Sequence, residues 1–384
     1  TEKRGSFAGW TLLLAIAAFS LSLLGTFLVR SGVITTVHAF ASDPTRGVFI
    51  LVFLAIVIGG SLLLYALRAP NSDDAANNGK PFTAMSRETL LLANNLLLVA
   101  ACAMVLLGTL YPLLADALDL GKISVGPPYF SLLFLLLMAP LVLLLPFGPL
   151  TRWQREDPLK PLAMLLPWAG LAVGIGIAAF FFAPQGAWKA AAGLAAAAWI
   201  TAGTLRFVWS RFAVTGSRFT AEMYGMTLAH LGVAVFLVGA LLTEGLSLQR
   251  ELALAPGQTA KIGGNAFRFD GVAHRVGPNF EADRGTVTVF RGASVVTTLH
   301  PEKRTYASGG QTMTEAAIDP GVFRDLYVAL GEPLGKNAWA VRVHIKPFVR
   351  WIWFGALLMA LGGFVTATDQ RFRQRTGRNQ EESA

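Results

Sequence analysis

Charged residues are scarce in this 384-residue chain, at 14%, whereas hydrophobic residues make up 54%. That balance excludes an ordinary soluble globular protein. Only one cysteine is present, Cys102, so an intrachain disulfide is excluded. Cys102 lies within an apolar run, where a thiol most often serves as a small packing residue. The sequence also lacks internal repeats, which are frequent in transporters.

Long apolar runs are abundant instead. A helix needs about 20 apolar residues to cross a bilayer core of about 30 Å. Eight runs meet that requirement: residues 10–29, 49–67, 90–114, 130–147, 162–183, 190–209, 224–243 and 348–367. The third, fourth and fifth have interior or terminal prolines, so we expect their ends to be poorly defined. The predicted fold class is a polytopic α-helical membrane protein with about eight transmembrane helices and one small periplasmic β domain.

The net charge of +9 is best explained by membrane topology, not by a nucleic-acid partner. Fifteen Lys and Arg residues flank alternate ends of the apolar runs, against four in the opposite short loops, namely Arg30, Arg46, Lys122 and Lys189. Because cytoplasmic loops carry the excess of positive charge, both ends of this chain are predicted to be cytoplasmic. The chain is thus predicted to cross its membrane several times, and the family resemblance described below implies a bacterial inner membrane.

One long external segment changes character. Residues 246–346 contain alternating apolar and polar residues in AFRFDGV, GTVTVFRG, SVVTTLH and AWAVRVHI, separated by Gly and Pro turns. This pattern predicts a periplasmic β domain. Residues 1–245 are predicted to form a seven-helix membrane region with an external loop around His38. Residues 347–384 are predicted to form the last span, with Trp351 and Trp353 at interfacial depth, and a basic cytoplasmic tail.

Several phrases resemble a known family over nearly the whole chain. They include GTFLVRSGVITTVHAFASDP, RETLLLANNLLLVAACAMVLLGTLYP, MTLAHLGVAVFLVG, MTEAAIDPGVFRDLYVALGEPLG and VHIKPFVRWIWFGALLMALGGF. The sequence resembles the cytochrome c maturation protein CcmF, the membrane subunit of the bacterial haem lyase. In that family the opening TEKRG follows a membrane helix, so the chain is interpreted as the C-terminal portion of a longer protein. The family's external Trp-rich WWD segment is not in this sequence.

His230 is the only histidine inside a predicted span. Ionisable groups in bilayer helices usually face a partner, a cavity or a cofactor. From the residue alone, a hydrogen bond between helices and a ligand role are equally compatible with this position. The resemblance of MTLAHLGVAVF to the family's haem-ligating helix implies that His230 is an axial ligand of a resident b-type haem.

His38 lies in a polar loop, where a solvated residue is the simpler interpretation. The resemblance of its phrase to the family's external haem-ligating loop implies instead an axial ligand of the substrate haem b. Arg30 either contacts a haem propionate or anchors the end of its helix. His38 and His230 lie toward opposite membrane faces, so they cannot share one iron, and each needs a partner histidine from outside this chain. His274, His300 and His344 are predicted to be solvated or packing residues of the β domain, and no catalytic residue is predicted.

The resemblance implies a subunit of the haem lyase that attaches haem covalently to apocytochrome c. The implied partners are an N-terminal half with the WWD segment, the haem chaperone CcmE, CcmH/CcmI-type subunits and apocytochrome c. Three alternatives stay open: a paralogous lyase for nitrite-reductase haem, a polytopic transporter, and a scaffold without haem chemistry.

Overall fold

The computed structural model describes residues 7–30, 44–68, 82–121, 123–184, 187–214, 219–307, 310, 312–335 and 337–369. Over these ranges, eight helical segments are long and apolar enough to cross a membrane. They run over Gly9–Val29, Val48–Arg68, Arg87–Asp116, Pro127–Leu150, Leu159–Phe182, Trp188–Ala213, Ala221–Leu246 and Val349–Ala367. The predicted polytopic fold with a β domain is confirmed, and each predicted span lies within a residue or two of one of these helices or inside it.

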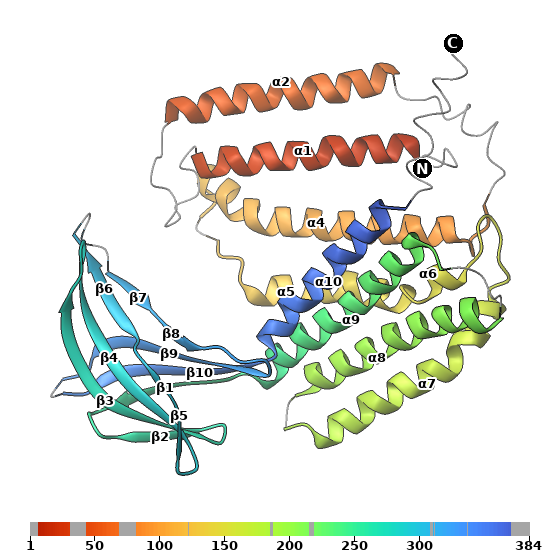
Figure 1. Ribbon diagram of the computed structural model, residues 1–384. Coiled ribbons are helices and arrows are strands. Elements are labelled where there is room, and N and C mark those ends of the chain that lie inside the picture. The colour runs from red at the N-terminus through yellow and green to blue at the C-terminus, as the bar shows by residue number, and fades with distance from the viewer. Residues whose placement is uncertain are drawn as a thin grey trace. The chain divides into compact units, whose positions relative to one another are not determined.

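The chain divides into two units, and Figure 1 labels the elements of both. The first comprises Thr1–Leu144 with Thr151–Pro158, and the second comprises Leu145–Leu150 with Leu159–Ala384. Helices of the first unit are α1 (Ala8–Arg30), α2 (Pro44–Arg68), α4 (Arg87–Ala117) and α5 (Pro127–Leu144). Helices of the second are α6 (Phe147–Leu150), α7 (Leu159–Phe182), α8 (Trp188–Trp209), the π-turn η1 (Ser210–Val214), α9 (Ala221–Leu246) and α10 (Val349–Ala367).

Prolines inside the spans do not end the helices, contrary to the expectation of poorly defined ends. Pro112 lies within α4, Pro140 within α5 and Pro167 within α7. Membrane helices tolerate internal proline because neighbouring groups and local adjustments satisfy the freed carbonyl in a medium without water. The helical backbone is interrupted at the junction of α5 and α6, next to Pro146.

In the first unit, the side chain of Glu88 is buried and hydrogen-bonded. Its Oε2 accepts a hydrogen bond from the backbone N–H of Gln154 at 2.8 Å. The preceding Ser86 caps α4 by accepting from the Thr89 N–H at 3.2 Å. A carboxylate in the first turn also interacts favourably with the helix dipole. The hydrogen bond to Glu88 therefore connects the segment after α6 to the beginning of α4.

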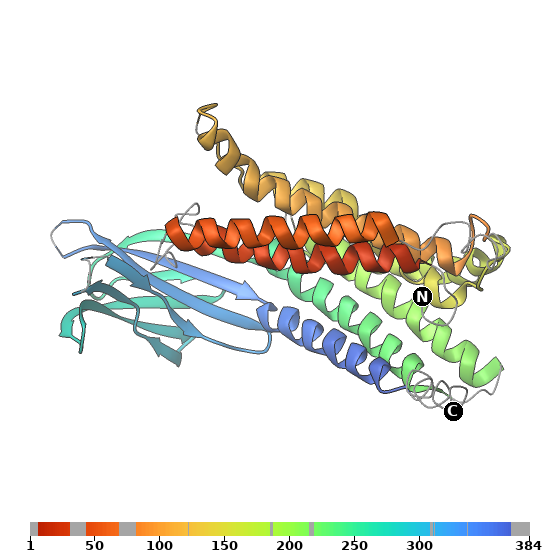
Figure 2. The same cartoon turned by 90° about the horizontal axis from the view of Figure 1, so that it is seen from above.

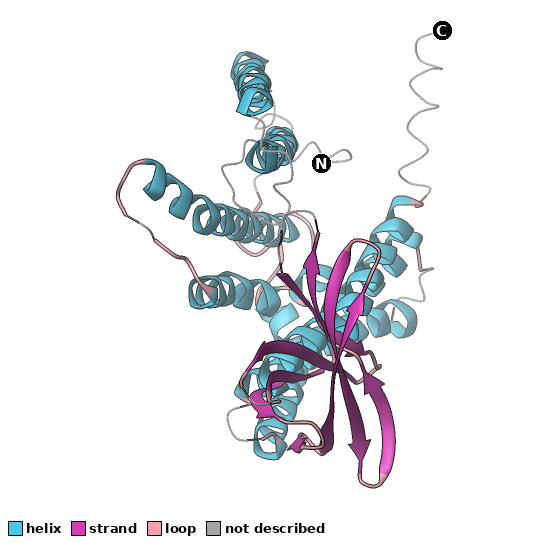
Figure 3. Ribbon diagram, turned by 90° about the vertical axis from the view of Figure 1, so that its left-hand side faces the viewer, coloured by secondary structure: helices cyan, strands magenta, loops and turns pink. Residues whose placement is uncertain are grey.

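Ten strands form the β domain, all paired antiparallel (Figure 3). Their bounds are β1 (Leu248–Leu254), β2 (Thr259–Ile262), β3 (Asn265–Val276), β4 (Phe280–Arg291), β5 (Ser294–Leu299), β6 (Glu302–Tyr306), β7 (Thr312–Glu315), β8 (Ala317–Asp319), β9 (Arg324–Pro333) and β10 (Trp339–Pro347). One sheet has the order β1-β10-β9-β8, and the other has the order β2-β3-β4-β6-β7 with β5 paired to β4.

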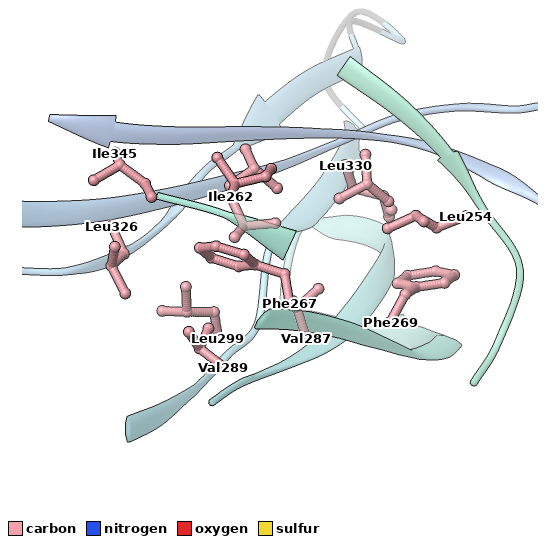
Figure 4. Close-up of a cluster of buried hydrophobic side chains, with 13 residues drawn as sticks. Leu254, Ile262, Phe267, Phe269, Val287, Val289, Leu299, Leu326, Leu330 and Ile345 are labelled. Carbon is pink, nitrogen blue, oxygen red and sulfur yellow. The ribbon is translucent and has the colours of Figure 1, made fainter. Parts of the chain in front are cut away.

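The two sheets enclose an apolar core. Alternate residues of each strand point inward, so β10 contributes Val341, Val343 and Ile345 while Arg342 stays exposed. Phe267 and Phe269 of β3 are fully buried opposite them, and Figure 4 shows these rings among aliphatic side chains from both sheets. Such interdigitated inner faces are the usual core of a β-sandwich.

The β domain is joined to the membrane by α9 and α10. β1 follows α9 after Ser247, and β10 leads through Phe348 into α10 (Figures 1 and 2). Helices α9 and α10 pack through glycines: a Cβ on Gly239 would lie 2.5 Å from the Ile352 backbone nitrogen, and one on Gly355 would lie 2.5 Å from that of Phe236. Small residues allow this close approach of membrane helices.

We expect Gly355→Val to destabilise the α9–α10 pair strongly. The added methyl groups would meet backbone atoms of α9 that cannot move aside, and overpacking of this kind costs about 1–3 kcal/mol or more. The matched control is Gly363→Val in the same helix, because a Cβ there meets nothing within 4 Å. Thermal unfolding of the two purified variants in detergent measures the difference. Equal midpoints would contradict the packing described for Gly355.

Candidate functional site

His230 lies inside α9, nine residues after Ala221 and sixteen before Leu246, which corresponds to about 14 and 24 Å along the helix axis. The helix begins three residues before the predicted run, so His230 lies one turn farther from the start of the helix than the sequence indicated. It remains much closer to the Ala221 end than to the β domain. Of the histidines that the structure describes, it alone belongs to a membrane helix.

The imidazole of His230 is held in one tautomer. Its Nδ1 lies 2.9 Å from the carbonyl oxygen of Met226, one turn earlier in the same helix. A carbonyl oxygen only accepts hydrogen bonds, so Nδ1 carries the proton and the neutral ring keeps its lone pair on Nε2. This is the arrangement found for metal-ligating histidines, whose second nitrogen donates to a carbonyl or carboxylate.

The other nitrogen of the ring has no protein partner in the described part of the chain. No hydrogen bond to Nε2 from a neighbouring Ser, Thr or Asn is formed there, so the interhelical hydrogen bond considered from sequence has no support. Thr227 lies three residues before His230 and therefore on the same side of α9. Its Oγ1 is buried and has no hydrogen-bond partner among the described residues. An unpartnered hydroxyl on the same helix face as an available imidazole nitrogen fits a ligand with an iron centre and polar substituents, such as haem.

Sequence reasoning missed Thr227. The signal was present, because a threonine at i−3 from a membrane histidine shares its helix face. What sequence could not show is that the hydroxyl is left without the backbone carbonyl bond that threonines in helices usually form. Over the described ranges, no cluster of three or more His, Cys, Asp or Glu residues is placed to hold a metal ion. His230 is thus a single ligand from this part of the chain.

His38 lies outside the described residues, in the segment between α1 and α2. Arg30 is the last residue of α1, and its side chain is likewise outside the description. Both assignments therefore stay predictions. The segment that contains His38 connects the end of α1 at Arg30 to the beginning of α2 at Pro44.

The β-domain histidines occupy positions that suit a folded domain rather than a haem site. His344 is half-buried on the face of β10 opposite the core, and partial burial, followed by the charges of Lys346 and Arg342, lowers its pKa below the ordinary value. His274 pairs with Asp283 across strands at 3.3 Å. His300 lies 3.4 Å from the Thr286 hydroxyl.

A charge cluster in the β domain was also missed. Glu302 is buried, accepts a 2.8 Å hydrogen bond from Arg304, and has Arg284 and Arg275 at 3.6 and 3.8 Å. Cross-strand register brings these residues together, and register cannot be read from alternation alone. The buried Glu302 carboxylate is thus paired with the guanidinium groups around it, and removing those groups would leave an uncompensated buried charge.

Comparison with known proteins relates these features to a family. Residues 245–347 match the family model described as the CcmF C-terminal beta-sandwich. Over 378 residues the chain is 53% identical to the cytochrome c-type biogenesis protein CcmF of Pseudomonas aeruginosa, an alignment that takes in 97% of this chain and 57% of that protein. The chain is therefore similar to CcmF proteins over nearly its whole length, and its β domain matches the family model.

A second CcmF protein shows the same extent of similarity. The protein of that name from Escherichia coli is 47% identical over 388 residues, covering 98% of this chain and 57% of the relative. The chain thus spans somewhat more than half the length of the curated relatives that it matches. A solved structure of Cytochrome c Heme Lyase CcmF superimposes with a TM-score of 0.73 at 23% identity, covering 94% of this chain and 55% of that one. That superposition supports the multi-pass fold with its β domain.

Proposed function

We propose that this chain forms part of a haem lyase that attaches haem covalently to apocytochrome c, and that His230 is an axial ligand of a resident b-type haem. The observation that carries the proposal is the imidazole of His230, whose Nδ1 is bound to the Met226 carbonyl and whose Nε2 has no hydrogen-bond partner among the described residues. The similarity of the chain to CcmF proteins supports a haem-binding role for this membrane histidine. The orphaned Thr227 hydroxyl beside it adds a polar contact for the bound group.

The second axial ligand comes from outside this chain. His274, His300 and His344 belong to the β domain, beyond the Leu246 end of α9, whereas His230 is about 24 Å before that end. A b-type haem used for electron transfer is well served by two histidines, since it needs no open iron position. The chain covers 57% of its relatives, and we assign the partner histidines and the WWD segment to the portion that it does not cover.

His38 serves a different haem under this proposal. If the eight helices cross the membrane in alternate directions, the end of α1 and the Leu246 end of α9 share one side of the membrane. His38 then faces the side of the β domain, whereas His230 is near the other side. Ligands of one iron lie within a few ångströms of it, so His38 holds the substrate haem and His230 the resident haem. Arg30, at the end of α1, is placed to meet a propionate of the substrate haem.

The residues of this chain position the haems and tune the electronic properties of the iron ligands. Haem supplies the vinyl groups to which the two thiols of apocytochrome c add, and the protein orients the reactants. His38 keeps the substrate haem at the membrane surface until the histidine of the apocytochrome motif replaces it. The Met226 carbonyl keeps the Nε2 lone pair of His230 available and raises the basicity of the imidazole. On the excess of basic residues on one side, we assign both chain ends to the cytoplasm and the β domain to the periplasm of a bacterial inner membrane.

The β domain and the external loop face the partners expected on that side: the haem chaperone CcmE, CcmH/CcmI-type subunits and apocytochrome c. A lyase dedicated to the haem of a nitrite reductase would share this arrangement, and it is distinguished by which apocytochrome motif is modified.

An absorption spectrum tests the proposal directly. We expect the purified chain alone to bind little b-type haem, because it supplies one ligand where two are needed. Co-expression with the N-terminal portion of a close CcmF relative should produce the paired α and β bands of a reduced bis-histidine haem. A reconstituted complex without these bands would contradict the proposal, and so would full haem occupancy of the isolated chain.

A further inference from the structure

The loop between β8 and β9 carries bulky apolar side chains on its surface. Val322 and Phe323 are 64% and 63% exposed. Polar contacts within the loop define its turn. The Gly321 N–H donates to Asp325 Oδ1 at 2.9 Å, and Arg324 pairs with Asp319 at 2.9 Å. The polar groups are thus satisfied at the base, and the tip presents hydrocarbon.

Contacts with α10 fix where this loop lies. The indole Nε1 of Trp351 donates to the carbonyl of Val322 at 3.1 Å, and the N–H of Phe348 donates to the carbonyl of Phe323 at 3.0 Å. The Phe323 ring centroid lies 6.1 Å from that of Phe348 and 6.3 Å from that of Trp351. Arg350 approaches Asp325 at 3.9 Å.

These partners are the first residues of a membrane span, because α10 begins at Val349. Anything bonded to Trp351 therefore lies at the level where the span enters the bilayer. Trp351 was predicted to anchor the helix at the interface, yet its N–H is used by the loop, which leaves Trp353, at 70% exposure, to face lipid directly. The membrane-facing surface thus continues from α10 onto the β8–β9 loop.

We infer that the β8–β9 loop binds the lipid bilayer, with Val322 and Phe323 inserted at the boundary between headgroups and acyl chains. Single exposed apolar residues need no explanation on a soluble surface. Here two adjacent ones are held rigidly beside an interfacial Trp, and aromatic and apolar side chains are favoured at that depth. The occupant is phospholipid, because the loop tip is uncharged and continuous with the lipid-facing surface of a span.

The loop then acts as a third attachment of the β domain. The other two are α9 and α10, and the Thr243 hydroxyl of α9 donates to the Pro347 carbonyl at 2.6 Å just before α10. Three attachments fix the tilt of a domain, whereas two neighbouring ones leave it free to rock. Which sheet face is presented to partners is thereby set by the membrane.

Spin-label depth measurements test this inference. In a Cys102→Ala background, Val322→Cys is labelled with a nitroxide and the full chain is reconstituted in phosphatidylcholine–phosphatidylglycerol vesicles. Val295→Cys is the matched control, since Val295 is a valine of β5 with 59% exposure in the other sheet. Trp353→Cys gives the lipid reference. Power saturation then compares the accessibility of each label to oxygen and to a nickel chelate.

We expect the label at position 322 to favour oxygen over nickel as the label at 353 does, and the label at 295 to favour nickel at least about threefold more. Nickel accessibility at 322 equal to that at 295 would place the loop in water and overturn the inference. A label at 322 shielded from both reagents would assign the loop to a protein contact and overturn it as well. Phe323→Cys repeats the measurement at a second site, and none of these readouts depends on haem.

Discussion

Replacing His230 with alanine is expected to abolish the b-type haem absorbance of the complex reconstituted with its N-terminal portion. The change removes the Nε2 lone pair and leaves the iron with one histidine. Disturbing even the hydrogen-bond partner of a metal-bound histidine typically costs about 10–100-fold in affinity, so losing the ligand itself should cost at least that. Reduced-minus-oxidised difference spectra of the purified variant, scaled to protein concentration, measure the loss.

Two controls separate ligation from folding. His344→Ala removes a half-buried imidazole from the outward face of β10 and should leave the spectrum unchanged. Size-exclusion chromatography of the His230 variant should show the same particle as wild type, because the side chain bonds only to its own helix. A correctly assembled His230→Ala complex that keeps its haem bands would show that His230 is structural.

Addition of imidazole sharpens the same experiment. A small exogenous ligand can occupy the space that the His230→Ala change leaves in α9 and provide the missing nitrogen to the iron. Partial recovery of the α band with imidazole, without recovery by an equal concentration of a non-ligating azole salt, would assign the loss to coordination.

Most of the fold follows from the sequence, because hydrophobic length is a strong signal. A continuous run such as residues 162–183 predicts a span with little ambiguity, since a helix satisfies every backbone group within lipid. Alternation in AWAVRVHI likewise predicts β10, where Val341, Val343 and Ile345 form part of the core. The bounds of the helices were less predictable. Helix α4 continues past Pro112. Helix α9 begins at Ala221, before the apolar run, because polar first-turn residues such as Glu222 do not count toward hydrophobicity.

The candidate site was predictable only in part. His230 was identifiable as a lone imidazole in a span, but its tautomer depends on the Met226 carbonyl, which any residue type would offer. The Thr227 hydroxyl has no hydrogen-bond partner among the described residues, and only the three-dimensional structure shows this. The link between the β8–β9 loop and α10 joins residues 29 positions apart through a backbone carbonyl, and no pattern of residue types encodes such a bond.

The packing of α9 is compatible with the ligand role that we propose for His230. This helix packs against both α8 and α10, and a Cβ on Gly193 of α8 would lie 2.6 Å from Leu241. Through the Thr243–Pro347 hydrogen bond, α9 is connected to the end of β10. A ligand on a helix fixed on two sides keeps its position, which suits an electron-transfer centre that must not reorganise.

Replacing His38 with alanine should give the opposite phenotype from the His230 variant: the resident haem stays, and cytochrome c assembly stops. The two residues are assigned to opposite sides of the membrane, so removal of one leaves the other coordination sphere untouched. Without His38 the substrate haem keeps only its partner ligand from the N-terminal portion. We expect covalent cytochrome c to fall at least about tenfold, measured by haem-stained gels of cells expressing a reporter apocytochrome.

The His38→Ala variant must show both results: retention of the resident haem and loss of cytochrome c assembly. His274→Ala, in the β domain, is the control for a general loss of external histidine, and it should mature cytochrome c normally because His274 only pairs with the exposed Asp283. If His38→Ala also lost the b-type bands, one haem would be coordinated from both sides, which a bilayer core of about 30 Å does not allow, and the topology itself would be wrong. Normal maturation with His38→Ala would instead make His38 an ordinary loop residue and assign the substrate haem to other ligands.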